Sequence, residues 1–328
     1  MKRQIDKSSP RVHDLVLFKT KNDTHVKEID RYSFERIDQE NKIKLVTDYR
    51  PFGSHFQYSI FIDNQSLALI TEIKIKIKFP FFFILSRYFP PTTKIPNLKT
   101  EKNVKQINFE FDKLNEESNK EIHLHFTPES LENIGEIRTI VTYVNNKNTI
   151  RVLDSGSTKI TVDKINIEPK VVPSSYVREF SQTPGIKKAI KSMGVGINYQ
   201  IEPEIYFEIL EKILYDRFFQ LVTKDLNKKI LWYFGTESIV KKDVLVIGQI
   251  ISNKIELIAL SQNQYLLISV LTQISNDFKN HLISNRFVDS KFDFYDLECK
   301  NCGAILPYFP QKMQKIACIN CNFQQVIW

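Results

Sequence analysis

Glycine is scarce in this chain of 328 residues, which contains nine of them. The scarcity excludes collagen-like and glycine-rich low-complexity sequence, and it leaves few places for a glycine-rich phosphate-binding loop. Long apolar runs are also missing: the longest, residues 79–85, has seven residues, whereas a membrane-spanning helix needs about 20. No apolar stretch follows the basic N-terminus, so we expect no secretory signal, no transmembrane segment and a cytoplasmic location.

A concentrated positive charge is lacking as well. The formal net charge of +8 is spread as +3, +2, +2 and +1 over residues 1–50, 51–170, 171–290 and 291–328. Phosphate-binding proteins gather their basic residues on one face, so this distribution does not favour a nucleic-acid partner. Such a partner stays open as the alternative, through the C-terminal segment and the N-terminal residues Lys2, Arg3, Lys7, Arg11, Lys19 and Lys21.

The chain does have a globular balance of 42% hydrophobic and 26% charged residues. Residues 1–40 are polar and charged without a clean period, which indicates a flexible or partly helical arm. Residues 41–170 show a period of two, clearest in Ile73-Lys74-Ile75-Lys76-Ile77-Lys78. This alternation places the isoleucines on one face of a strand and the lysines on the other. Many short strands without intervening helices predict an all-β sandwich.

The period changes to 3.6 within residues 171–290. Apolar residues at helical spacing predict one helix that begins near Pro203 and a second from about Gln264 to Ile283, with Asn263 as its N-cap. Three strands are expected between them: Ile230–Phe234, Val244–Ile251 and Ile255–Leu260. Helix, strands and helix together predict a compact α+β domain.

All four cysteines lie in residues 291–328, in two Cys-x-x-Cys pairs separated by fifteen residues. Each pair can fold two thiolates onto one side of a tight turn, and two pairs complete a tetrahedral S₄ shell. The alternatives are two disulfides, which a cytoplasmic chain disfavours, or a redox dithiol, which does not need two pairs. We therefore predict a zinc ribbon with one structural Zn²⁺ and no free ligand position. The ligands are Cys299, Cys302, Cys318 and Cys321.

Catalytic motifs are absent from the sequence. It contains no G-x-S-x-G, no G-x-x-x-x-G-K-[ST] and no H-E-x-x-H. His123 and His125 share one face of a predicted strand and could ligate a metal, but no carboxylate or cysteine accompanies them in a matching motif, so we interpret them as ordinary surface or core histidines. No nucleophile, base and oxyanion donor come together, and we expect a protein that is not an enzyme.

The segment Tyr58–Ser66, followed by Ile73–Phe79 and Pro80, resembles the immunoglobulin-like sandwich of the appendage (ear) domains of clathrin adaptors and coatomer. Glu121–Pro128 and Gly135–Tyr143 fit the same scheme. The later helix–strands–helix order is similar to the platform subdomain of those appendages, so the resemblance covers residues 45–285. Residues 297–328 resemble rubredoxin-like zinc ribbons. The resemblance implies a non-catalytic adaptor or scaffold that binds a protein partner or peptide motif, as appendages do in vesicle-coat assembly.

Appendage platforms commonly present an aromatic residue, often Trp, from their first helix. Here that helix offers Tyr206 and Phe207 instead, and Trp232 falls on a predicted strand, where burial in the core is its expected fate. These three residues are the candidates for partner binding. Appendages usually end a long coat subunit, whereas this sequence ends in a zinc ribbon, so the fold can be kept while the partner and cellular role differ. The sequence does not indicate the oligomeric state.

Overall fold

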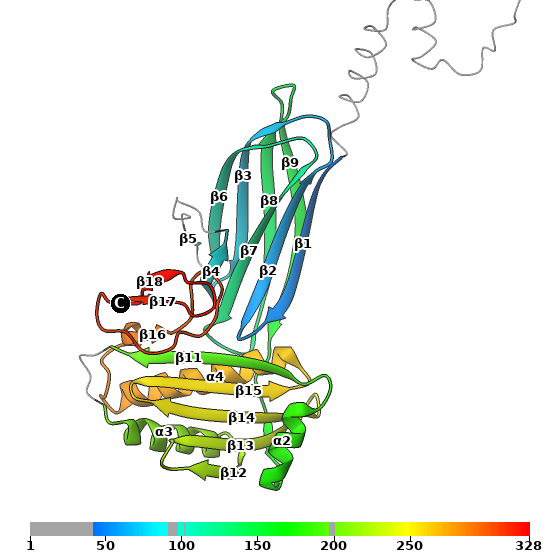
Figure 1. The fold of residues 1–328 in the computed structure, drawn as a ribbon. Helices are drawn as coiled ribbons and strands as arrows, with labels where there is room; N and C mark the ends of the chain where they lie inside the picture. Colours follow the sequence, from blue (N-terminus) through cyan, green and yellow to red (C-terminus); the bar gives the residue numbers. More distant parts are fainter. Residues whose placement is uncertain (1–41, 91–97, 102, 197–200) are drawn as a thin grey trace, which may run out of the picture.

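The computed structural model describes residues 42–90, 98–101, 103–196 and 201–328. The predicted N-terminal arm, residues 1–40, lies outside them. A pair of packed sheets, a larger sheet with helices and a small cysteine-containing module follow one another along the chain (Figure 1). This order confirms the predicted fold class of a β-sandwich, then an α+β region, then a small C-terminal module.

Antiparallel strands in two sheets make up the sandwich. The first sheet has the order β1-β2-β7-β4, formed by β1 Ile43–Phe52, β2 His55–Asn64, β7 Ser118–Pro128 and β4 Phe83–Phe89. The second has the order β5-β6-β3-β8-β9, formed by β5 Leu98–Glu101, β6 Val104–Leu114, β3 Ile70–Pro80, β8 Asn133–Val144 and β9 Ile150–Val162. Strand β3 alternates as predicted: Ile73, Ile75 and Ile77 are buried in the core, whereas Lys74 and Lys76 are exposed.

The α+β region contains a seven-stranded sheet of order β10-β13-β14-β15-β11-β16, with β12 also paired to β13. Its longer strands are β11 Lys187–Val195, β12 Gln220–Asp225, β13 Ile230–Glu237, β14 Lys242–Ile251 and β15 Lys254–Ser261. Helices α3 Pro203–Asp216 and α4 Gln264–Ser284 cover one face and enclose the larger core, whereas α2 Ser174–Gln182 packs on the opposite face (Figure 1). The two predicted helices are thus present, and α2, β11 and β12 are additions to the prediction.

Two short strands pair across the predicted region boundaries. β10 Ile167–Pro169 directly follows the sandwich in sequence but pairs with β13. β16 Phe294–Asp296 directly precedes the cysteines but pairs with β11. The seven-stranded sheet therefore extends beyond residues 171–290 at both ends, because strand pairing is a long-range interaction that local composition does not report.

Helix α4 joins the sandwich to the larger sheet. Most of its buried residues face the sheet, but Ile268 belongs to the sandwich core. The Tyr265 ring centroid lies 5.9 Å from that of Phe56 on β2, and Asn276 donates a hydrogen bond to the backbone carbonyl of Glu129 at 2.8 Å. The two regions share a packed interface on one side of α4.

Candidate metal centre

The two Cys-x-x-Cys pairs have the same backbone geometry. In the first, the Cys299 amide donates to the Ala304 carbonyl at 2.8 Å, and the Gly303 amide donates back to the Cys299 carbonyl at 2.8 Å. In the second, Cys318 bonds Phe323 at 3.0 Å and Asn322 bonds Cys318 at 2.9 Å in the same way. Gly303 and Asn322 hold the left-handed conformation, with φ of +75° and +57°, which glycine and asparagine tolerate best.

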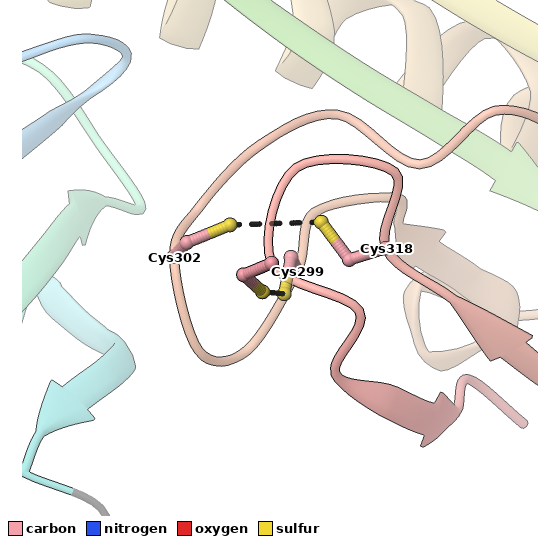
Figure 2. Close-up of side chains that lie close together, drawn as sticks. Cys299, Cys302 and Cys318 are labelled. Carbon is pink, nitrogen blue, oxygen red and sulfur yellow. Dashed lines mark hydrogen bonds between the residues drawn. The ribbon is translucent and has the colours of Figure 1, made fainter.

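These matched turns, fifteen residues apart in the sequence, bring the four sulfur atoms together (Figure 2). All four lie within 4.8 Å of one another. The Cys299–Cys321 and Cys302–Cys318 Sγ···Sγ distances are both 3.6 Å, far longer than the roughly 2.05 Å of a disulfide. A tetrahedral shell with zinc–sulfur bonds of about 2.3 Å has edges of about 3.8 Å, so the cluster can hold one metal ion.

Each pair also supplies an amide donor to the sulfur of the other pair. The Asn301 side chain donates to Cys321 Sγ at 3.6 Å, and the Asn320 side chain donates to Cys302 Sγ at 3.5 Å. In the metal-free protein, hydrogen bonds from the Phe323 backbone and from Asn301 lower the pKa of Cys321 to about 6. Burial raises the pKa of Cys299 to about 12. Binding of a divalent cation must therefore displace protons, because the metal ligand is the thiolate.

The ribbon has a very small apolar core. Its fully buried members are Leu297, Leu306, Ile316 and two of the cysteines. Strands β17 Lys315–Ala317 and β18 Gln324–Val326 form its single hairpin. A segment with so few buried side chains needs a further source of folding free energy, which a metal bound to the four cysteines would supply.

Residues from the sandwich and the sheet fix the ribbon in place. His55 on β2 lies between Thr127 Oγ1, 2.7 Å from its Nδ1, and Glu298 Oε2, 2.5 Å from its Nε2. Lys254 on β15 donates to the Leu306 carbonyl at 2.7 Å. Neither His55 nor Lys254 was among the sequence candidates, because their roles depend on contacts with residues 243 and 52 positions away in the sequence.

A second sandwich residue, Arg87 on β4, lies against the first cysteine pair. Its Nη1 donates to the Asn301 carbonyl at 3.3 Å, and its Nη2 lies 3.3 Å from His125 Nδ1. Burial lowers the pKa of Arg87, and Glu298, Cys302 and Cys299 act in the opposite direction. The thiol cluster thus has a guanidinium beside it.

The predicted partner-binding residues do not share one surface, because Tyr206 and Phe207 lie on α3 and Trp232 lies on β13. Tyr206 and Phe207 on α3 are 1% and 6% exposed, inside the core between the helices and the sheet. These two side chains pack the core and offer no surface to a partner, because the apolar stripe of α3 faces the sheet. Trp232 on β13 is half-buried on the opposite face and remains a prediction.

The histidines set aside as metal ligands make protein contacts. His123 Nδ1 lies 2.8 Å from Ser59 Oγ and its Nε2 lies 3.0 Å from Glu121. In the described ranges, the four cysteines form the one group of His, Cys, Asp and Glu side chains close enough to share an ion. None of the helices described is both long and apolar enough to cross a membrane.

No protein-family model and no curated protein matches this chain. Among solved structures, a non-cellulosomal cohesin from Archaeoglobus fulgidus aligns at 14% identity over 37% of this chain and 85% of its own, with a TM-score of 0.21. BcpA, the major pilin subunit of Bacillus cereus, aligns at 10% over 47% and 48%, with a TM-score of 0.26. The sporulation control protein Spo0M of Bacillus subtilis aligns at 9% over 75% and 99%, with a TM-score of 0.22. Scores this low establish neither a shared fold nor a shared function.

Proposed function

We propose that the protein is a non-catalytic interaction module, stabilised by one structural Zn²⁺ in the ribbon, that binds a peptide segment of a partner protein. Zinc suits the centre because four thiolates in a tetrahedral arrangement are its usual structural shell. Four protein ligands leave no position for water or substrate, so the metal's role would be to stabilise the ribbon. The reduced thiols that this site requires fit the predicted cytoplasmic location.

The observation that supports the peptide-binding role is an apolar row on the face of the large sheet opposite α3 and α4. The antiparallel register aligns Trp232, Ile247, Ile258 and Ile190 across four adjacent strands. All four side chains are half-buried, and Ile247 and Ile258 pack beside the small core under α2. Apolar side chains gathered on an accessible face are typical of an interaction surface.

Charges around this row indicate the chemistry of the partner. Three acidic residues of this face are already paired: Asp243 with Lys170 at 2.7 Å, Glu256 with Lys254, and Glu168 with Lys241 at 3.4 Å. A fourth, Asp225, lies opposite Ile230 at the β12 edge of the sheet. Lys188 is on the same face as Ile190, is exposed and has no ion-pair partner among the residues described. The row with its free cation fits a peptide that carries a bulky apolar side chain flanked by aspartate or glutamate.

Selection from a displayed library of random peptides on the zinc-loaded protein tests this proposal. Enriched sequences should combine bulky apolar residues with acidic ones, and their binding should be lost in Ile247→Ser. The matched control is Ile150→Ser, which changes a 71% exposed isoleucine on β9 of the sandwich. Peptides that bind Ile247→Ser as tightly as the unaltered protein, or no enrichment at all, would contradict the proposal.

One observation favours nucleic acid as a second candidate partner. Residues 300–328 contain Lys300, Lys312 and Lys315 and no aspartate or glutamate, and all three lysines are exposed. If this segment binds phosphates, affinity for a labelled single-stranded oligonucleotide should fall steeply with added salt. Replacing all three lysines with glutamine should then abolish binding. Absence of binding at about 0.15 M salt would eliminate this candidate.

A further inference from the structure

We propose that Arg87 is the outer-sphere cation of the metal centre, and that it couples metal binding to docking of the ribbon on the sandwich. Its guanidinium balances the charge of the four thiolates from a position fixed by strand β4. The inference rests on the metal site proposed above and adds a residue that lies 214 positions before its contact Asn301 in the sequence.

The backbone of β4 directs Arg87 toward the ribbon. β4 is an edge strand of its sheet, and its pairing with β7 shifts register between Leu85 and Arg87, so that Arg87 lies opposite His125. A bulge of this kind adds one residue to a strand and re-aims the side chain that follows. Phe52, whose ring centroid lies 5.9 Å from the guanidinium carbon, and His125 then flank the guanidinium.

On the ribbon side, the guanidinium rests on the backbone of the first cysteine pair. A Cβ atom placed on Gly303 would lie 2.5 Å from the guanidinium carbon of Arg87, so a larger residue at this position would require the guanidinium to shift. The hydrogen bond to the Asn301 carbonyl holds the same turn. Arg87 thereby contacts the residue inside the pair and the residue that directly follows it.

Charge explains why a cation belongs here. Four thiolates and one divalent metal leave a net charge of −2 in a partly buried site, which is unfavourable without a compensating group. Arg87 is half-buried, its Nε has no hydrogen-bond partner, and no carboxylate of the described residues lies within ion-pair distance of it. The guanidinium therefore offsets the charge of the centre across the boundary between sandwich and ribbon, and Glu298, which is paired with His55, is its other anionic neighbour.

The test compares zinc affinities, measured by competition with a chromophoric chelator, in the full chain and three variants. Arg87→Gln should weaken zinc binding about 10- to 100-fold, the usual effect of removing an outer-shell partner. Arg87→Lys should recover part of this loss, because it keeps the charge and loses the planar fork. Lys254→Gln is the matched control: it removes a different anchor of the ribbon, the bond to the Leu306 carbonyl, and should leave the affinity near that of the unaltered protein.

The outcomes separate this inference from the metal site itself. An unaltered chain that binds no zinc overturns both. Equal zinc affinity in the unaltered chain and Arg87→Gln overturns the role of Arg87 alone. An equal loss of zinc affinity in Arg87→Gln and Lys254→Gln also overturns it, because the loss would then reflect loosened docking of the ribbon in general.

Hydrogen exchange tests the coupling directly. Removing the metal from the unaltered chain should raise amide exchange in residues 299–303 and also in β4. In Arg87→Gln, removal should raise exchange in residues 299–303 but leave exchange in β4 unchanged. If exchange in β4 of the unaltered chain does not respond to metal removal, docking is independent of the metal and the coupling is refuted.

Discussion

At the scale of single residues, buried polar side chains define how the sandwich meets the ribbon. His125 is buried beside Arg87 and close to His55 and His123. Burial, followed by the positive charges of these neighbours, lowers the pKa of His125 to about 3. The ring is therefore neutral near pH 7, and it can accept a hydrogen bond from Arg87.

The low pKa of His125 predicts a pH dependence of stability. The His125 ring binds a proton near pH 6.5 in the unfolded chain and only near pH 3 in the folded chain. Its contribution to the free energy of unfolding is therefore fully present above about pH 6.5 and is lost as the pH falls from 6.5 to 3. The His125 ring signal should not titrate between pH 7.5 and pH 5 when followed by NMR. His125→Gln should reduce the loss of stability in this range, whereas His281→Gln on α4 serves as the control. A His125 ring that titrates near pH 6.5 would refute the prediction.

Gly303 and Gly53 offer a matched pair for measuring the contact with Arg87. Both have positive φ, +75° and +61°, but a Cβ on Gly53 meets nothing within 4 Å, whereas one on Gly303 meets the guanidinium. Alanine at either position should cost about 1 kcal/mol for the backbone conformation. Gly303→Ala should cost about 1–3 kcal/mol more, because the guanidinium must move. Urea unfolding of the two zinc-loaded variants measures the free energy of unfolding that each substitution removes. Equal losses would show that the Arg87 guanidinium moves aside at no cost.

At the scale of elements, the sequence predicts the helices and strands whose hydrophobic pattern is clear within one short segment. Strand β3 and helices α3 and α4 have strong periods, and Asn263 caps α4 as expected, accepting hydrogen bonds from Tyr265 and Leu266 at 3.0 and 3.3 Å. Helix α2 was missed because it is short and begins after a proline without a side-chain cap. Strand β11 was missed because its lysines and glycine obscure the alternation, and its stability comes from pairing with β15 and β16.

The same contrast holds for the candidate site. The cysteines were predictable because the ligand spacing is written in one short segment, and the turn residues Gly303 and Asn322 accompany it. Arg87 and His55 were not predictable, since a bulge and a hairpin in the sandwich place them against a segment more than 200 residues away. The aromatic candidates on α3 were misplaced because the helix stripe that carries them also forms the core.

The cap of α4 gives a prediction for an element that serves two cores. Asn263→Ala removes the acceptor for two backbone amides and should destabilise the protein by about 1 kcal/mol. Asn263→Asp keeps an acceptor oxygen at the cap and should retain most of the stability. Unfolding in urea followed by circular dichroism compares the two variants. Equal losses in both would mean that the asparagine acts through another contact.

At the scale of the whole molecule, the cores differ in how far they depend on metal. The sandwich and the large sheet each enclose an extensive set of buried side chains, and Ile268 of α4 belongs to the sandwich core. The apolar core of the ribbon has five buried residues, two of which are Cys299 and Cys318 of the candidate metal centre. With a metal bound at this centre, the folding of the ribbon would be tied to it, whereas the other two regions carry their own apolar driving force.

Metal removal should accordingly unfold the ribbon and spare the rest of the protein apart from the edge strand β4. After chelation, amides in residues 297–328 should lose protection from hydrogen exchange, apart from any held by contacts with Lys254 and His55. The central strands β13 and β14 and the sandwich strand β3 should keep theirs, because their buried neighbours belong to cores that contain no cysteine. Adding zinc back should restore protection in the ribbon. Loss of protection throughout the chain would instead mean that the ribbon holds the sandwich and the sheet together, and that their interface through α4 is too weak to do so alone.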